Sequence, residues 1–472
     1  MKKELVLLAT VAASVALPAL AEPEITNMNL SRDDHTHLVT ISYDLSEPAI
    51  VTAQVLTNGV ALPHSAYGNM VGDVHRVVKA NTARKIYWKP PTPTLDALVA
   101  AGNAEVKLSA WAKDDPPDYL AIDLITTNCW RFYVTADDVP LGVTNKIYKT
   151  SKLLMRKIYA KNIKWPMGTS TDGSYATPRH KLHYVTLTTN YYISVYEMTK
   201  RQYRSGSCYN FNVYDNNTVV VIRERADDAL RPMPLSFNHM RRQTDSCYWP
   251  THGHDLTSDS GLYRLRKKTG LNLDLTTEAE WEYACRAGTA TKLYTGEAVT
   301  EANVAKVAWF TANWTNDPVA VAVGKKTDTH AVGQLLPNAW GLYDMLGNAW
   351  EICLDVMSDK SADPYQIDPY KGENIVDPVG PTAEQGAAAQ QEGGTYVDKN
   401  GKTQYTWPNY VTASGRRARR GGAVSDNTSS ATNTMAYTSI YAETRKNIAS
   451  GVGSSDNYTD VGYRLALPAV IP

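Results

Sequence analysis

The residues best suited to chemistry lie between Asn338 and Glu351. This fourteen-residue stretch holds two Trp, one Tyr, two Gly and the carboxylates Asp344 and Glu351. Gly permits tight turns, and the backbone carbonyls of such turns can join carboxylates as ligands of a hard cation such as calcium. The alternative is that the two acids accept hydrogen bonds from buried backbone amides without a metal. Either way, the mixture is typical of a rigid, turn-rich core segment.

A second candidate is the polar segment 425–439, which follows a basic cluster at residues 416–420. Eleven of its fifteen residues are Ser, Thr, Asn or Asp, and Tyr437 lies among them. Small polar residues give adaptable hydrogen bonding and Tyr gives rigid contact area, as in recognition loops. An ordinary polar surface loop would have a similar composition, so both interpretations stay open.

The sequence contains no motif typical of hydrolytic or phosphate-binding sites, and no catalytic residue is assigned. The ten His are scattered without a motif, and no Gly-rich phosphate loop followed by Lys occurs. The formal net charge of zero argues against a nucleic-acid partner, because such surfaces need a strong basic excess.

Two capping boxes indicate the helices that position these stretches. Thr199 with Gln202, and Thr277 with Glu280, have the spacing that lets side chains and backbone amides bond reciprocally at a helix start. The second box opens a helix with Trp281 on its buried face. Capping and core ion pairs are therefore the expected roles of the nearby Glu residues, in preference to catalysis.

The stretch 338–351 closely resembles the signature NxxGLYDMxGNVWEW of the formylglycine-generating enzyme, or sulfatase-modifying factor, family. Three further pieces match in order, at residues 192–199, at 277–286, and at Arg420-Gly421-Gly422 together with Gly462-Tyr463-Arg464. The resemblance covers roughly residues 150–468. It implies an irregular α+β fold related to C-type lectins.

The resemblance also implies two metal sites, of which this sequence keeps the ligands of one and lacks those of the other. In the family a structural calcium is held by the equivalents of Asp344, Gly347, Ala349 and Glu351, and all four residues are compatible with that role. The family's oxidase activity uses copper held by two Cys shortly after the Arg-Gly-Gly motif, because Cu(I) prefers thiolates. This chain has no Cys after Cys353; Asp426 stands near the first expected position and Ala431 near the second. Calcium is expected, and copper and formylglycine generation are not.

In the resembled fold, the C-terminal polar segment lines the groove where ligands dock. The residues expected to contact a ligand there are Asp426, Asn427, Asn433, Tyr437, Tyr441 and Arg445. The leading hypothesis is an exported, non-catalytic protein that recognises a protein, peptide or glycan. The alternative is a sulfatase-maturation-type oxidoreductase or another metal-dependent enzyme with an altered active site, so enzymatic activity is left open.

The N-terminus predicts export. Residues 1–21 have two Lys, an apolar run and a small-residue cleavage site, which is the pattern of a signal peptide. No later run approaches the ~20 apolar residues of a membrane span. The location is therefore periplasmic, cell-surface or extracellular. The five Cys are an odd number, so at least one is unpaired within the chain, and Cys208 with Cys247 is the best candidate disulfide.

Short alternating strands interrupted by turns fill residues 22–118. The expected strands are 38–45, 49–57, 85–88 and 104–112, with a turn at Asn58-Gly59. They predict a small all-β sandwich of immunoglobulin-like type. A charged, Pro-containing stretch at 114–118 marks the end of this domain. A connecting segment follows at 119–149, and the large domain occupies 150–472. A strand is expected from Ile147 into the large domain.

Overall fold

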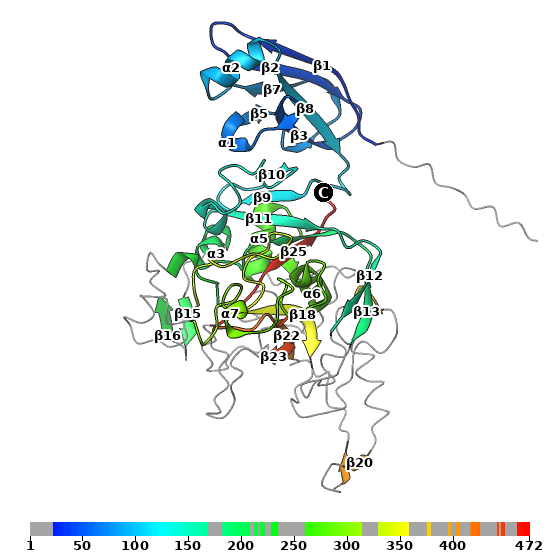
Figure 1. Ribbon diagram of the computed structural model, residues 1–472, viewed down its shortest axis with the longest axis vertical. Helices are drawn as coiled ribbons and strands as arrows, with labels where there is room; N and C mark the ends of the chain where they lie inside the picture. Colours follow the sequence, from blue (N-terminus) through cyan, green and yellow to red (C-terminus); the bar gives the residue numbers. More distant parts are fainter. Residues whose placement is uncertain are drawn as a thin grey trace, which may run out of the picture.

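The computed structural model divides into a small N-terminal unit and a larger unit that follows it, drawn in blue and in cyan to red in Figure 1. It describes residues 22–168, 182–207, 212–215, 218–221, 228–234, 260–313, 329–357, 375–378, 395–397, 403–405, 416–424, 441–442, 445–448 and 460–472. The protein is mixed α/β, with several sheets and few helices among these residues.

The N-terminal unit contains two sheets that enclose one core. One sheet has the order β1-β2-β7-β5, with bounds β1 Ile25–Arg32, β2 Val39–Leu45, β7 Asn81–Trp88 and β5 Met70–Gly72. The other joins β4 Val60–Ala61, β3 Ala49–Thr57 and β6 Arg76–Val78, and β8 Ala104–Trp111 also pairs with β3. Short helices α1 (His64–Tyr67) and α2 (Pro93–Ala100) complete it.

Alternation in the sequence explains these strands. Val39, Ile41, Tyr43 and Leu45 of β2 face the core, and the residues between them are partly exposed. Asn58 and Gly59 have φ values of 50° and 76°, as the expected tight hairpin turn requires. The four expected strands therefore exist, three of them with nearly the expected bounds, whereas the strand expected at 85–88 begins four residues earlier at Asn81. An immunoglobulin-like topology stays a prediction.

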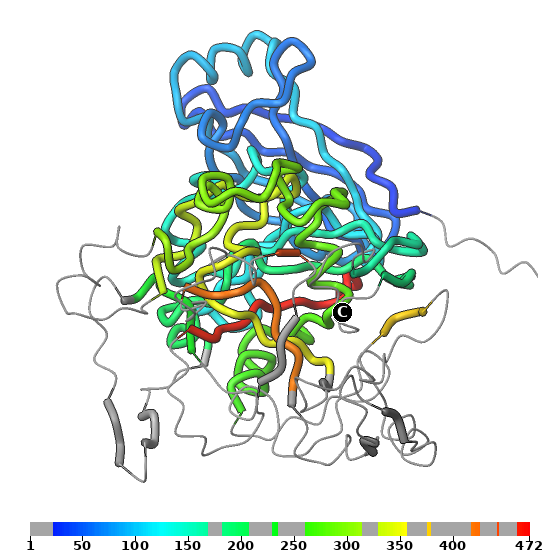
Figure 2. The backbone as a smooth tube through the Cα atoms, turned by 60° about the horizontal axis from the view of Figure 1, so that its bottom comes forward, coloured from blue at the N-terminus to red at the C-terminus, as the bar shows by residue number. Residues whose placement is uncertain are grey.

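The larger unit is built on a six-stranded antiparallel sheet of order β10-β9-β11-β14-β25-β17. The bounds are β9 Tyr119–Asp123, β10 Trp130–Tyr133, β11 Lys152–Ile158, β14 Tyr191–Ser194, β17 Asp274–Leu275 and β25 Leu465–Pro468. β25 comes from the end of the chain, and Figure 2 shows this red segment crossing the middle of the unit. Residues 119–149 thus supply two strands of this sheet as well as a connection.

Smaller sheets and helices surround the central sheet. One sheet has the order β23-β22-β18-β24, with bounds β23 Arg445–Ile448, β22 Arg416–Arg420, β18 Trp350–Met357 and β24 Val461–Gly462. Another sheet joins β12 Ile163–Met167, β13 His183–Leu187 and β19 Ile375–Val376. Two separate strand pairs are β15 Asn212–Asp215 with β16 Thr218–Val221, and β20 Thr395–Val397 with β21 Thr403–Tyr405. The helices are α3 Lys200–Ser207, α5 Gly261–Thr269, α6 Glu278–Arg286 and α7 Glu301–Val304, with 3-10 turns η1 Lys146–Lys149 and η3 Asp228–Leu230. No helix in the described ranges is long and apolar enough to cross a membrane.

Both predicted capping boxes are confirmed. Thr199 N–H donates to Gln202 Oε1 at 3.0 Å, and Gln202 N–H donates to Thr199 Oγ1 at 3.1 Å. Thr277 and Glu280 make the equivalent pair at the start of α6. The expected strand from Ile147 is wrong at its beginning. Asn145 accepts a hydrogen bond from Ile147 N–H and starts the 3-10 turn η1, so the strand begins only at Lys152.

Candidate functional site

The stretch 338–351 folds as a series of turns fixed by its own polar side chains. Asn338 Oδ1 accepts hydrogen bonds from the amides of Trp340 (3.0 Å) and Leu342 (3.1 Å), and Asn338 Nδ2 donates to the carbonyl of Ala284 in α6 at 2.7 Å. Gly347 has φ +73°, and a Cβ there would lie 2.5 Å from the carbonyl oxygen of Trp309. Only Gly fits at that point, so the turn packs directly on the neighbouring backbone.

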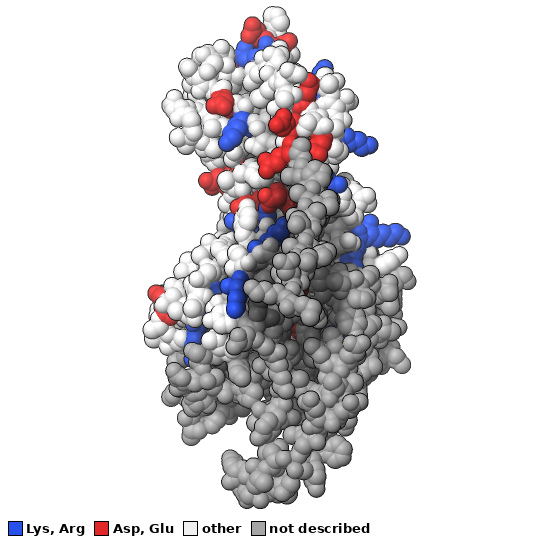
Figure 3. All heavy atoms as spheres, turned by 90° about the vertical axis from the view of Figure 1, so that its right-hand side faces the viewer, with Lys and Arg blue, Asp and Glu red and all other residues white. Residues whose placement is uncertain are grey.

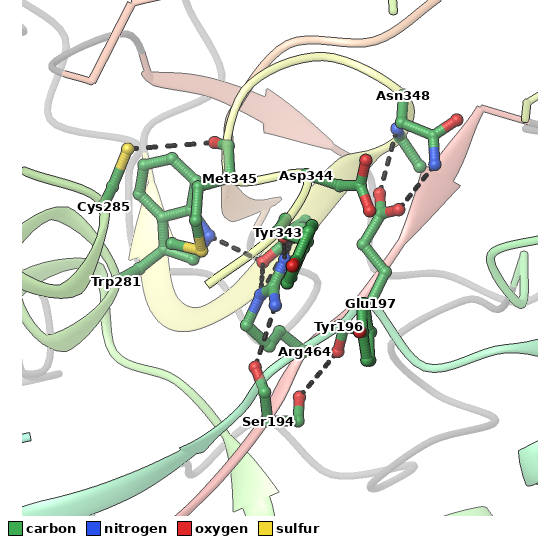
Figure 4. A network of polar contacts seen from close by, with 12 residues as sticks. Ser194, Tyr196, Glu197, Trp281, Cys285, Tyr343, Asp344, Met345, Asn348 and Arg464 are labelled. Carbon is green, nitrogen blue, oxygen red and sulfur yellow. Dashed lines mark hydrogen bonds and ion pairs between the residues drawn. The ribbon is translucent and has the colours of Figure 1, made fainter. Parts of the chain in front are cut away.

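Three buried carboxylates gather behind these turns. They are Glu197, Asp344 and Glu351, which we call the acid cluster, and each is 3% exposed or less. Glu351 makes an ion pair with Arg464 at 2.8 Å and accepts from the indole N–H of Trp281 at 2.7 Å. Arg464 also donates to the carbonyls of Ser194 and Tyr343 (Figure 4). One guanidinium therefore ties β14, the turns and β18 together.

Asn348 connects the acid cluster to Val424, the last described residue before the polar segment. Its side-chain Nδ2 donates to Glu197 Oε2 at 2.6 Å, and its Oδ1 accepts from His330 N–H at 2.8 Å. The other Glu197 oxygen accepts from Ala349 N–H at 3.1 Å. The carbonyl of Asn348 accepts from Val424 N–H at 3.0 Å, which fixes the backbone immediately before residue 425.

The acid cluster carries more negative charge than its neighbours neutralise. Burial raises the pKa of Glu197 well above its usual value, and the negative charges of Asp344 and Glu351 raise it further. Burial raises the pKa of Asp344 to about 6, although the Gly333 amide that donates to it at 2.6 Å acts the other way. The site therefore favours a proton or a cation beside Glu197 and Asp344.

A second buried network nearby is balanced. Arg420 contacts Glu278 at 2.7 Å and Glu282 at 2.9 Å, and Arg286 contacts Glu282 at 2.7 Å. Burial alone would raise the pKa of Glu282, but the two guanidinium groups outweigh it and the pKa is lowered. This network holds α6 against β22 and has the structural role expected for its Glu residues.

The residues expected to hold calcium lie in this region. Asp344 and Glu351 belong to the acid cluster, Gly347 N–H donates to the Gly421 carbonyl at 2.8 Å, and Ala349 N–H faces Glu197. Both Glu351 oxygens accept from Arg464, and one of them also accepts from Trp281. In the described ranges no group of three or more His, Cys, Asp or Glu side chains is arranged to hold a metal.

Most of the expected ligand-contacting residues lie outside the described residues. These are Asp426, Asn427, Asn433 and Tyr437. Tyr441 is partly buried, and Lys292 Nζ lies 4.8 Å from its ring centroid. Arg445 pairs its backbone with Arg420 in the sheet of β22 and β23.

The sequence predicted a capping or core ion-pair role for Glu197 and placed Arg464 in a family motif, but it did not bring Glu197 and Asn348 into one site with Glu351. A local signal existed for Asn348, since Asn tolerates the left-handed backbone (φ 60°) that follows Gly347. Nothing local could have paired it with Glu197, which lies 151 residues earlier.

Two cysteine thiols lie near the site but are inaccessible. Cys285 and Cys353 are free and fully buried, and burial raises the pKa of both thiols. Each Sγ contacts a backbone carbonyl at 3.8 Å. Because a thiolate is the form that binds copper, neither thiol is poised as a metal ligand. Cys208 and Cys247 lie outside the described residues.

Comparison with known proteins identifies the larger unit. A family profile described as "Sulfatase-modifying factor enzyme 1-like domain" matches residues 155–428. The formylglycine-generating enzyme of Streptomyces coelicolor is 35% identical over 126 residues, which is 26% of this chain and 36% of that enzyme. The Bos taurus enzyme is 29% identical over 125 residues, which is 26% of this chain and 30% of that enzyme. The chain thus spans about a third of the length of these curated relatives.

Solved structures with some likeness include Treponema denticola variable protein 1. It is 21% identical, with a TM-score of 0.39 and coverage of 67% of this chain and 95% of that one. PvdO from Pseudomonas aeruginosa is also 21% identical, with a TM-score of 0.37 and coverage of 66% and 93%.

Proposed function

The chain belongs to the family of sulfatase-modifying factor enzyme 1-like domains, and we propose that it is a non-catalytic member that recognises a protein, peptide or glycan. The observation that carries this proposal is the lack of a Cys pair after Arg420-Gly421-Gly422, where the family's copper ligands stand. No Cys follows Cys353, and the thiols of Cys285 and Cys353 are buried and held as neutral groups. Copper-dependent oxidation needs accessible thiolates.

The recognition surface in this proposal is the polar segment 425–439 together with Tyr441 and Arg445. Support comes from its composition and from the hydrogen bond that fixes the residue before it. The segment begins one residue after Val424, whose amide is bonded to Asn348 at the edge of the buried site. A segment that starts from a rigid point can vary in sequence while the fold stays fixed.

We further propose that the protein is exported after cleavage near residue 21, and that the N-terminal unit is an immunoglobulin-like sandwich serving as a spacer or partner module. Support is the signal-type pattern of residues 1–21 and the two-sheet core of residues 25–111.

A screen on peptide and glycan arrays, followed by titration of the best ligand, tests recognition. Replacing Tyr437 or Asn433 with Ala should weaken binding by about tenfold or more, the effect of truncating a binding hot spot, a class in which Tyr is enriched. The matched control is Tyr87→Ala, which removes a Tyr that is 38% exposed in the N-terminal unit, and it should bind normally. Full binding by both segment variants would contradict the proposed surface.

Incubation with a sulfatase-motif peptide, copper and oxygen separates binding from the enzymatic alternative. We expect no aldehyde product by mass spectrometry. Detectable turnover would overturn the non-catalytic assignment even if the array screen found a ligand.

Calcium remains part of the proposal, and the donor set fits it in part. Asp344 offers a buried carboxylate in an acid cluster with excess negative charge, but Glu351 would have to share its oxygens with Arg464 and Trp281. Bound calcium would supply the missing positive charge and hold the turns.

Removing calcium should therefore lower the melting temperature. At a calcium concentration of 100 times Kd, the stabilisation is about 2.7 kcal/mol. A shift of several degrees between EDTA-treated and calcium-loaded protein is expected, and Asp344→Asn should abolish the shift. An unchanged melting temperature, together with no calcium in metal analysis of reloaded protein, would contradict the site.

A further inference from the structure

The junction between the two units is held by specific contacts. Phe132 N–H of β10 donates to the His75 carbonyl at 2.9 Å, and His64 N–H of α1 donates to the Asp137 carbonyl at 2.8 Å. Ile50 of β3 packs into the hydrophobic core of the larger unit. The N-terminal unit is thus fixed on β10, and a cavity at this junction has a defined shape.

A cavity of about 280 Å³ lies at the junction, with one face of the central sheet as its floor. Arg131 of β10 lies opposite Ala121 of β9, and Lys152 of β11 lies opposite Asp123 of β9. All four residues line the cavity. The small side chain of Ala121 leaves room between the charged groups.

The walls combine polar and apolar groups from both units. His64 and Asn69 come from the N-terminal unit, and Leu141, Tyr148 and Tyr133 come from the larger one. A second cavity of about 280 Å³ shares His64, Asn69, Arg131 and Tyr133 with the first, so the two adjoin along Arg131. Domain junctions of this kind are frequent ligand sites.

Positive charge in the cavity is not neutralised. Lys152 is paired with Asp123 at 3.4 Å, whereas the Arg131 guanidinium donates to the carbonyl of Trp130 at 2.9 Å and meets no acid among the described residues. His64 bonds to Asn69 at 3.1 Å, and burial lowers the pKa of its ring, so it adds no charge at neutral pH. On the face drawn in Figure 3, the described surface carries both basic and acidic side chains.

We propose that this cavity binds a small organic carboxylate with an apolar body, and that Arg131 is the residue that binds its carboxylate. The planar guanidinium fork matches a carboxylate, and Tyr133, Leu141 and Tyr148 offer apolar surface for the rest of the molecule. The cavity is lined by residues 64–152, and its test does not depend on the proposal for segment 425–439.

Cys129 provides a direct reporter, because it is free, partly exposed and lines the cavity. The experiment measures alkylation of Cys129 by peptide-resolved mass spectrometry in the full chain, with phenylacetate or its neutral amide as the probe, and calorimetric titration runs in parallel. Phenylacetate should protect Cys129 saturably and bind about tenfold or more tightly than phenylacetamide, since a charged hydrogen bond is lost in the amide.

Variants locate the carboxylate contact. Arg131→Gln should remove the preference for phenylacetate, and Lys107→Ala, which deletes an exposed cation of β8 outside the cavity lining, should keep it. Equal binding of the two probes, an unchanged preference in Arg131→Gln, or neither protection nor heat at millimolar phenylacetate would overturn the proposal. Protection by inorganic phosphate as strong as that by phenylacetate would overturn the ligand class.

Discussion

Replacing Arg464 with Ala will destabilise the protein by about 3–5 kcal/mol, the range expected when one partner of a buried ion pair is removed. Arg464 and Glu351 are each 1% exposed or less, so the carboxylate left behind has no access to water. The guanidinium also donates to two backbone carbonyls that would lose a partner. Urea unfolding followed by circular dichroism measures the change.

An exposed ion pair supplies the control for Arg464. Lys306 and Glu297 lie 2.6 Å apart with side chains 45% and 38% exposed. Lys306→Ala should change stability by no more than about 1 kcal/mol. Arg464→Lys keeps the positive charge but loses the planar guanidinium group. It should therefore fold with a partial loss of stability even if Arg464→Ala does not fold. A loss below 1 kcal/mol in Arg464→Ala would show that the acid cluster does not depend on this cation.

Asn348→Ala is expected to cost about 3–7 kcal/mol. It leaves a Glu197 oxygen and the His330 amide without their side-chain partner in a buried place, at about 1–3 kcal/mol for each group. It also puts Ala at φ 60°, which adds about 1 kcal/mol. Denaturant unfolding of the purified variant measures the sum.

Two substitutions separate these contributions. Asn348→Gly removes the same hydrogen bonds without backbone strain, so it should be about 1 kcal/mol less harmful than Asn348→Ala. Asn58→Ala puts the same strain at φ 50° in an exposed hairpin turn and should cost only about that amount. If Asn348→Ala cost no more than Asn58→Ala, the side-chain bonds to Glu197 and His330 would contribute nothing measurable.

Local patterns predicted the parts of the fold that local physics decides. The alternation in residues 39–45, the Asn58-Gly59 turn and the capping box of Thr277 all depend on neighbours within a few residues, and all were confirmed. The strand expected from Ile147 began late because a single Asn side chain at 145 favoured a 3-10 turn.

The composition of the buried site was less predictable because its partners are distant in sequence. Arg464 and Glu351 are 113 residues apart, and Asn348 and Glu197 are 151 apart. Each residue alone is compatible with a surface role. Only the packing of β14, β18 and β25 brings the charges together, and four of the expected ligand-contacting residues, Asp426, Asn427, Asn433 and Tyr437, lie outside the described residues. The recognition surface therefore stays a prediction.

The position of β25 has a consequence for how the chain acquires its structure during synthesis. Residues 465–468 lie between β14 and β17, and the amide of Ile471 bonds to the carbonyl of Lys113 at the junction. The central sheet cannot close until these late residues have left the ribosome. The larger unit therefore matures after translation of this strand, whereas the N-terminal unit, whose strands are all encoded before residue 112, can fold first.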